Sequence, residues 1–176
     1  KRIALTNAPW ALDGAAIAAA LDLEQGLLLN DFEAQALAAP VLPDDWSRPV
    51  GPQPAADPRG VRLVVGPGTG FGVGLVVPAG GKIRALATEG GHTDLAPVGA
   101  EEEAIWRVIA RVAGRITPES TLSGAGLARL HAAREAVAGR AAGVATAAAL
   151  TQAALADPQG PEAQTLRHAW RLLGRV

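Results

Sequence analysis

The chain has 176 residues, about the size of one domain, and 49% of them are apolar, mostly Ala, Val and Leu. It carries 16 Lys and Arg against 17 Asp and Glu, a balance that excludes the basic surplus a nucleic-acid partner requires. Cysteine is absent, which excludes disulfides, thiolate metal sites and a cysteine nucleophile and fits a reducing cytoplasm, and no apolar run reaches the roughly 18 residues that span a membrane.

The first forty residues show alternating strand and helix patterns. Residues 3–5 have the composition of a short strand, and Asp13 offers an N-cap for an Ala-rich helix over 15–21. Residues 27–29 have the pattern of a buried strand, and a second helical stretch follows over 32–37. The expected order of elements is therefore β-α-β-α.

Asn30 and Asp31 lie at the junction between the second expected strand and the second helix. The carboxyl end of a buried strand is where open α/β sheets place ligand-contacting residues, and an aspartate there can act as a base. Asn and Asp also cap helices at such junctions, which is a structural role only. The local sequence leaves both interpretations open.

A proline-rich stretch separates this region from the next. Six of the 13 prolines lie between residues 40 and 60, a density that excludes a helix interior or a central strand and indicates a connection between domains. Beyond it, three apolar segments joined by Gly-rich turns predict an antiparallel meander. The segments are 61–65, 72–77 and 83–87, and the turns are 66–70 and 80–81.

The glycine-rich stretch from Gly66 to Gly74 is the densest signal for chemistry, because a bare backbone can wrap around a phosphate with its N–H groups pointing inward. It is not a Walker A loop, since no Gly-Lys-Ser/Thr follows, and its glycines lack the spacing of a dinucleotide fingerprint. Glycine is also common in tight turns that bind nothing. An anion loop and a plain turn both fit the pattern.

Residues 89–94 bring Glu89, His92 and Asp94 together after the third expected strand. Three interpretations compete: metal ligation, recognition of sugar hydroxyls, and a polar loop without a role. A metal would need further ligands, and no other histidine or cysteine is nearby in the sequence. Carboxylates, in contrast, accept paired hydrogen bonds from neighbouring sugar hydroxyls.

The remainder of the chain is expected to be mostly helical. Residues 101–115 begin with three glutamates and end with arginines, which suits the two ends of one helix dipole, and an apolar stripe runs between them. Two further helices are predicted over 144–156 and 163–173, separated by an Asp-Pro stop and a Gly-Pro turn.

The serine in the segment 122–126 does not have the surroundings of a hydrolase nucleophile. A nucleophile elbow requires glycine two positions before the serine, and Thr121 stands there before Ser123. The segment is therefore interpreted as the start of a helix, and Pro118 with Glu119 as an exposed turn.

Taken in chain order, these segments resemble the bacterial glucokinase family, the hexokinase-like sugar kinases of the actin-like ATPase superfamily. The resemblance covers most of residues 3–127, and it is the order of several weak motifs that makes it specific. The segments that carry it are Leu5-Thr6-Asn7 with Trp10, Leu29-Asn30-Asp31-Phe32, Gly66-Pro67-Gly68-Thr69-Gly70-Phe71-Gly72, Glu89-Gly90-Gly91-His92-Thr93-Asp94, Glu101-Glu102-Glu103-Ala104-Ile105 and Leu122-Ser123-Gly124-Ala125-Gly126-Leu127.

The resemblance implies an α/β fold of the actin-like ATPase (ribonuclease-H-like) type, a two-lobe sugar kinase fold present here as a partial chain. Residues 1–40 would be the end of the small α/β domain, 41–60 the interdomain connection, and 61–176 the first part of the large α/β domain, a meander followed by helices. A neighbouring kinase family has a cysteine-rich zinc cluster after its Gly-Gly-His. A chain without cysteine cannot form that cluster, so no metal ligands are expected.

The implied activity is the ATP-dependent phosphorylation of the 6-hydroxyl of glucose or a similar hexose, a step of cytoplasmic glycolysis. By resemblance, Asp31 is the general base. The residues implied to contact the sugar are Asn30, Asp31, Glu89, His92 and Glu119. Gly68, Thr69 and Gly70 would form the second phosphate loop of the ATP site, with Mg²⁺ stabilising charge on the transferring group.

Two segments of the family pattern are missing: an Asp-containing, Gly-rich first phosphate loop and a Gly-Gly adenosine-binding segment. The chain also begins at Lys1 and contains no methionine, so it is interpreted as the central portion of a longer enzyme, inactive by itself. An incomplete sheet and apolar helix faces would favour association, for example as a homodimer. The alternative is a truncated or non-catalytic relative that binds sugar or a partner without phosphoryl transfer.

Overall fold

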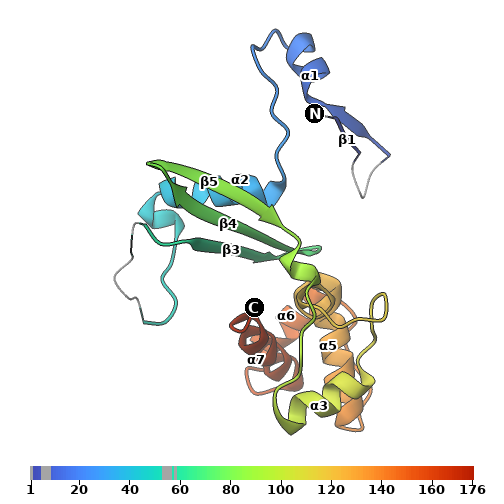
Figure 1. Cartoon of the computed structure of the whole chain (residues 1–176). Helices are drawn as coiled ribbons and strands as arrows, with labels where there is room; N and C mark the ends of the chain where they lie inside the picture. Colours follow the sequence, from blue (N-terminus) through green and yellow to red (C-terminus); the bar gives the residue numbers. More distant parts are fainter. Residues whose placement is uncertain (1, 5–8, 53–56, 58) are drawn as a thin grey trace.

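A strand pair at the N-terminus is the first of three parts of the chain in the computed structural model, which describes residues 2–4, 9–52, 57 and 59–176 (Figure 1). Strand β1 (Arg2–Ala4) pairs antiparallel with β2 (Ala11–Asp13), and helix α1 (Gly14–Ala20) follows directly. Asp13 caps α1, as expected, by accepting hydrogen bonds from the Ala15 and Ala16 amides at 3.0 and 3.3 Å. The first expected strand is confirmed at residues 3–4, whereas Leu5 lies outside the described residues.

The expected strand at residues 27–29 is wrong. The segment has no regular structure, and Leu27 is 79% exposed. An apolar run becomes a strand only when a neighbouring strand satisfies its N–H and C=O groups, and none of the strands among the described residues pairs with it. The expected β-α-β-α order is therefore replaced by a strand pair, α1, an extended segment and then α2 (Asp31–Ala38).

The predicted meander is confirmed. Strands β3 (Arg62–Pro67), β4 (Phe71–Ala79) and β5 (Lys82–Thr88) form an antiparallel sheet in that order. Gly80 and Gly81 at the β4–β5 turn both have positive φ, +58° and +75°, as a two-residue hairpin turn of type I′ requires. Before the sheet, the proline-rich segment forms two single-turn 3-10 helices, η1 (Ala39–Val41) and η2 (Asp44–Trp46).

Helix α2 lies across one face of this sheet, on a surface formed by glycines (Figure 1). A Cβ added to Gly72 would lie 1.9 Å from two ring atoms of Phe32, and one added to Gly66 would lie 2.5 Å from the same ring. A Cβ on Gly74 would lie 2.7 Å from the Phe32 carbonyl oxygen. Part of the glycine-rich signal is thus explained by helix packing rather than by a ligand. The predicted division into domains at residues 41–60 stays a prediction, although α2, which precedes that boundary, packs on the sheet that follows it.

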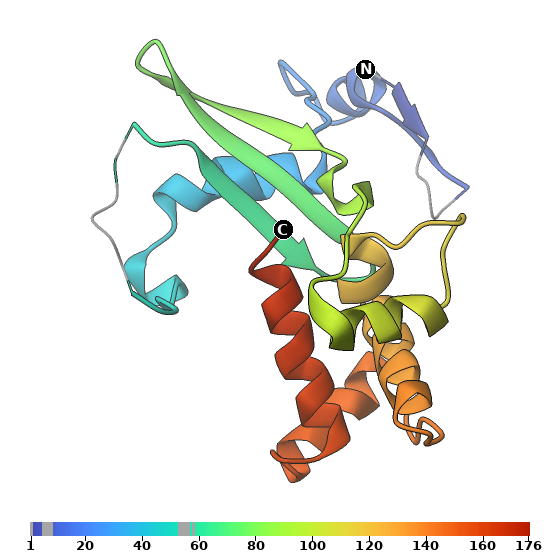
Figure 2. The same ribbon diagram turned by 60° about the horizontal axis from the view of Figure 1, so that its bottom comes forward.

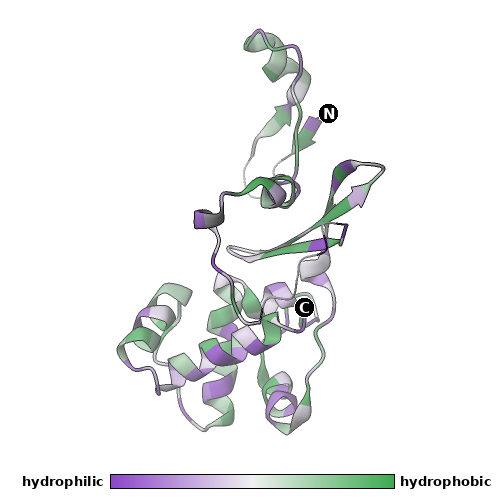
Figure 3. Cartoon of the chain, turned by 90° about the vertical axis from the view of Figure 1, so that its left-hand side faces the viewer, coloured by the Kyte–Doolittle hydropathy of each residue, from purple (hydrophilic) through white to green (hydrophobic). Residues whose placement is uncertain are grey.

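The third part of the chain is a group of helices that pack against one another (Figure 2). These helices are α3 (Gly99–Val108), α4 (Pro118–Leu122), α5 (Gly124–Val137), α6 (Ala147–Ala156) and α7 (Pro161–Leu173). Ile105, Leu130 and Leu172 are buried at the centre of the core, and Phe71 and Val73 of β4 extend it to the sheet. Hydrophobic and hydrophilic residues alternate along these helices (Figure 3), as expected for helices with one buried face. None of the described helices is long and apolar enough to cross a bilayer.

The predicted helices over 144–156 and 163–173 are confirmed with shifted starts, but the helix predicted over 101–115 ends at Val108. Ala113 and Gly114 have φ values of +50° and +79°, and Val112 pairs with Arg115 across this turn. The apolar spacing continues beyond Val108 because residue 109 is also buried, although its backbone is extended. A 3.6-residue spacing therefore extended the prediction past the true end of the helix.

A buried polar cluster joins α3, α5 and α7. Nε2 of the fully buried His168 lies 3.2 Å from Glu102 Oε1, and its Nδ1 lies 2.9 Å from Arg134 Nη1. Because a guanidinium can only donate, Nδ1 accepts from Arg134 and Nε2 carries the proton that faces Glu102. Burial, with the charge of Arg134, lowers the pKa of His168. Burial alone would raise the pKa of Glu102, but hydrogen bonds from Val98 N and Arg175 lower it.

This cluster predicts that the protein loses stability as the pH falls below 6.5, the ordinary pKa of histidine. The pKa of His168 in the folded state lies below its ordinary value of 6.5, so its contribution is complete above that value and is lost as the pH falls towards the folded pKa. His168→Gln keeps one acceptor and one donor, and should flatten this part of a plot of thermal midpoint against pH. His92→Gln, at an exposed histidine, is the control, and an equal slope in both variants would contradict the assignment.

Candidate functional site

One cleft of about 380 Å³ is lined by all eight residues that the sequence analysis selected. They come from the start of α2, the β3–β4 turn, the segment after β5 and helix α4. The eight residues are Asn30, Asp31, Gly68, Thr69, Gly70, Glu89, His92 and Glu119. Segments up to about ninety positions apart in the sequence thus meet at one place.

Asn30 and Asp31 reach the cleft from the N-terminus of α2 rather than from the end of a strand. Asn30 Oδ1 accepts from the amides of Phe32 and Glu33 at 2.9 and 3.3 Å, so the capping interpretation is confirmed for Asn30. Capping uses only the side-chain oxygen, and its NH₂ group is not part of the cap. Asp31 Oδ1 accepts from Phe32 N at 2.9 Å, and the positive end of the helix dipole favours its carboxylate.

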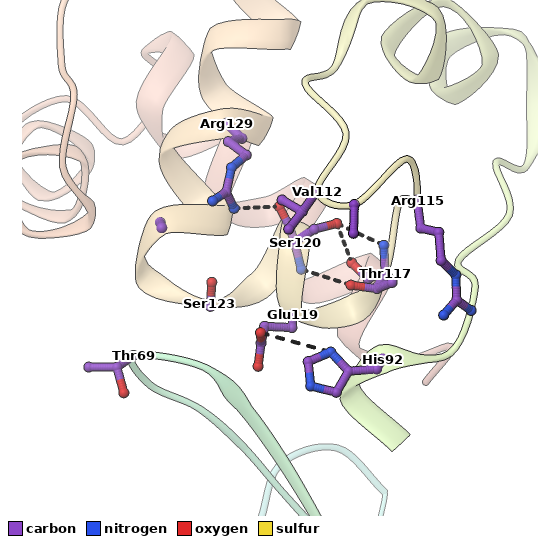
Figure 4. A pocket seen from close by; sticks show the side chains of 11 residues that line it. Thr69, His92, Val112, Arg115, Thr117, Glu119, Ser120, Ser123 and Arg129 are labelled. Carbon is purple, nitrogen blue, oxygen red and sulfur yellow. Dashed lines mark hydrogen bonds and ion pairs between the residues drawn. The ribbon is translucent and has the colours of Figure 1, made fainter. Parts of the chain in front are cut away.

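His92 lies between two carboxylates in the 3-10 helix η3 (Gly90–His92). Its Nε2 is 3.6 Å from Glu89 Oε2, and its Nδ1 is 3.9 Å from Glu119 Oε1, an approach visible in Figure 4. Asp94 does not line the cleft; it forms an ion pair with Arg115 at 2.7 Å, and the hydrogen bond from Arg115 lowers the pKa of Asp94. Within the described part of the chain, no group of three His, Cys, Asp or Glu residues is arranged to hold a metal.

Glu119 lies on α4, where the sequence analysis expected an exposed turn, and that expectation is wrong. Thr117 and Ser120 form a capping box: Thr117 Oγ1 accepts from Ser120 N at 3.1 Å, and Ser120 Oγ accepts from Thr117 N at 2.7 Å. Pro118 occupies the first helical position and is buried. Thr-Pro is a recognisable start of a helix, so the sequence held a signal for α4 that the analysis missed. The predicted helix start near Ser123 is confirmed, since Ser123 caps α5.

The β3–β4 turn is attached to the helices by a backbone hydrogen bond, and its tip is open. Gly68 O accepts from Gly124 N at 2.8 Å, which joins the turn to the N-terminus of α5. Gly68 N donates to Gly70 O at 2.9 Å, so the segment forms a tight turn, as one of the two interpretations stated. No atom lies within 4 Å of a Cβ added at Gly68, and Thr69 is exposed. The turn thus presents its backbone to the cleft.

A second cavity of about 340 Å³ shares Thr69, His92 and Glu119 with the lining of the cleft (Figure 4). Arg129 contributes to its wall and donates from Nη1 to the Ser120 carbonyl at 3.2 Å. Arg129 is not among the residues expected from the sequence, because a single arginine within an Ala-rich helix matches no motif.

Comparison with known proteins identifies the family. A family model described as Glucokinase matches residues 1–176. The chain belongs to the glucokinase family. The glucokinase of Chromobacterium violaceum is 45% identical over 131 residues, which are 74% of this chain and 37% of that protein. The glucokinase of Sinorhizobium medicae is 38% identical over 174 residues, which are 99% of this chain and 51% of that protein.

Solved glucokinase structures share the fold. A glucokinase from an Antarctic psychrotroph superposes with a TM-score of 0.84 at 30% identity, over 98% of this chain and 53% of that one. The glucokinase of Balamuthia mandrillaris, solved in complex with glucose, gives a TM-score of 0.50 at 19% identity over 64% of this chain, and this likeness concerns the fold alone. The expected sugar kinase fold, present as a partial chain, is confirmed. The chain spans about half the length, or less, of the glucokinases it matches.

Proposed function

We propose that this chain carries the sugar site and one phosphate-binding turn of a glucokinase, which transfers the γ-phosphoryl group of ATP to the 6-hydroxyl of glucose. The observation that carries the proposal is the single cleft lined both by the β3–β4 turn and by Asp31, Glu89, His92 and Glu119. A phosphoryl transfer requires donor and acceptor sites to be adjacent, and one cleft supplies that adjacency.

Asp31 is proposed as the general base. Its carboxylate is held by the first turn of α2 and would orient the 6-hydroxyl and accept its proton while the new P–O bond to the sugar forms and the bond from the γ-phosphorus to the departing ADP breaks. The amides of the turn at Gly68, Thr69 and Gly70 would stabilise negative charge on the phosphates. Mg²⁺, when bound with ATP, would supply further charge neutralisation on the transferring group.

Sugar recognition is assigned to the polar groups around His92. The NH₂ group of Asn30 can donate, the carboxylate of Glu89 can accept hydrogen bonds from two neighbouring hydroxyls, and Glu119 can accept through Oε1. The imidazole of His92 between these carboxylates can bridge a hydroxyl to either one. A set of oriented donors and acceptors distinguishes a polyol from an apolar ligand, because a ligand without hydroxyls would leave these groups unpaired.

The proposal is tested by a coupled phosphorylation assay of the natural full-length protein that contains this sequence, with ATP and a panel of hexoses. We expect turnover with glucose and formation of glucose 6-phosphate. Hexose binding without turnover would favour the alternative, a non-catalytic relative, and the absence of both binding and turnover would overturn the proposal.

Replacing Glu89 with alanine is expected to raise the KM for glucose about tenfold or more and to leave the KM for ATP nearly unchanged. The lost carboxylate leaves sugar hydroxyls without acceptors, and hydrogen bonds to charged groups are the stronger ones. Asp94→Ala is a matched control, since Asp94 lies in the same segment but pairs with Arg115 outside the cleft. Equal KM values for glucose in the two variants would remove Glu89 from the sugar site.

A further inference from the structure

One backbone unit, the first residue of β4, connects the proposed sugar residues to the proposed phosphate turn. The Phe71 N–H donates to Glu119 Oε2 at 3.0 Å. The Phe71 carbonyl lies close to Gly91, because a Cβ added to Gly91 would be 2.2 Å from the carbonyl oxygen. The segment that contains Gly91 and His92 therefore packs against Phe71 as well. Residues 68–70 of the turn immediately precede Phe71 in the chain.

The two oxygens of Glu119 have different surroundings. Oε2 is bound to the backbone of β4, whereas Oε1 faces His92 Nδ1 at 3.9 Å, and the side chain is 37% exposed in the cleft. The carboxylate also touches the turn itself, since a Cβ on Gly70 would lie 2.6 Å from Oε2. A carboxylate accepts stronger hydrogen bonds than a neutral oxygen does, so this contact fixes the geometry of the turn well.

Helix α4 holds the backbone of Glu119 in a fixed position. The capping box at Thr117 and Ser120 fixes the start of the helix, and the other residues of α4 are buried. Thr121 adds a hydrogen bond from its hydroxyl to the Thr117 carbonyl at 2.9 Å. The backbone of Glu119 is therefore held in place by α4. The distance between the carboxylate and the β3–β4 turn can change only if the Glu119 side chain changes its rotamer or the turn itself moves.

We infer that Glu119 is the positioning residue of the phosphate turn, so that one carboxylate links the sugar site to the nucleotide site. The inference rests on the proposed function, in which the turn binds ATP phosphates and Glu119 faces the sugar. Oε2 holds the Phe71 amide and with it the end of the turn, while Oε1 stays available to the sugar. Loss of this carboxylate should therefore impair both substrates.

The first test compares Glu119→Ala with Glu119→Gln by measuring KM for ATP and for glucose in the natural full-length protein. Alanine removes both contacts, and each KM should rise about tenfold or more. Glutamine keeps an oxygen that can accept from Phe71 N, so its KM for ATP should return to within about threefold of the original value while its KM for glucose stays raised. A residue that only bound sugar would leave the KM for ATP unchanged in Glu119→Ala, and that result overturns the inference.

The second test approaches the same contact from the turn. Gly70→Ala places a methyl group against Glu119 Oε2, whereas Gly124→Ala adds a methyl group at the neighbouring start of α5, where the nearest atom is 3.6 Å away. Glucose affinity, measured by calorimetry without ATP, should fall about tenfold in Gly70→Ala and by less than about threefold in Gly124→Ala. Equal glucose affinity in the two variants contradicts the link, and if Gly70→Ala does not fold, the Glu119 pair decides.

The outcomes separate this inference from the proposed function. An unmodified protein that neither binds nor phosphorylates a hexose overturns the proposed function and the inference with it. An unmodified protein that phosphorylates glucose, together with a normal KM for ATP in Glu119→Ala, overturns the inference and leaves the proposed function standing.

Discussion

Replacing Asp31 with asparagine should lower kcat by about 10²- to 10⁴-fold, the usual contribution of a positioned general base. Asparagine is nearly isosteric, so its side chain can still accept a hydrogen bond from Phe32 N and contact the sugar hydroxyl, but it cannot take up the proton. Glucose affinity should therefore change much less than kcat, which is the pattern of an interaction that matters mainly in the transition state.

The measurement is a steady-state assay of the natural full-length protein together with direct glucose binding. Glu33→Gln is the matched control, because Glu33 is the other acidic residue in the first turn of α2 and does not line the cleft. It should retain nearly full turnover. A kcat for Asp31→Asn close to that of Glu33→Gln would exclude Asp31 as the base.

Replacing Gly72 with alanine is expected to destabilise the fold by about 1–3 kcal/mol, the usual cost of an extra methyl group in a close-packed interior. The new Cβ would lie 1.9 Å from the Phe32 ring, so α2 must move away from the sheet or the ring must adopt a strained rotamer. Because Asn30 and Asp31 begin this helix, activity should fall as well. Urea unfolding followed by tryptophan fluorescence gives the change in the free energy of unfolding.

Two variants test the origin of this loss. Gly68→Ala, in the adjoining turn, meets no neighbouring atom and should be destabilised by less than about 0.5 kcal/mol. In the double variant Gly72→Ala with Phe32→Leu, the smaller side chain makes room for the methyl group. The loss of unfolding free energy in the double variant should therefore be smaller than the sum of the losses in the two single variants. Strict additivity would show that the Phe32 contact is not the cause.

The elements that the sequence predicted well are those defined by neighbouring residues. The β4–β5 turn needs only its two glycines, and α7 has a complete apolar stripe with proline at its first position. The strand at residues 27–29 failed because a strand depends on a partner elsewhere in the chain. Helix α3 was predicted too long because burial at Ile109 continues the helical spacing after the helix itself has ended.

The candidate site was predictable as a set of residues but not as an arrangement. The resemblance selected eight residues, and the fold brings all of them to one cleft. The bond between Glu119 and Phe71 joins residues 48 positions apart, and no local pattern encodes it. The glycines at 66, 72 and 74 look like a ligand loop in the sequence, yet three-dimensional packing against Phe32 accounts for them.

The β4–β5 turn offers a practical opportunity for following the protein in solution. Gly80 and Gly81 are exposed, have no atom within 4 Å of an added Cβ, and lie at the end of the sheet away from helices α3 to α7 (Figure 1). Exposed tips of small residues tolerate insertion well. A short tag carrying one cysteine, inserted between these glycines, would be the sole thiol of the chain and would accept a fluorophore at a single defined point. In a variant that keeps the buried Trp106 as its only tryptophan, energy transfer from Trp106 to that fluorophore would report how the sheet and the helices move when ligands enter the cleft.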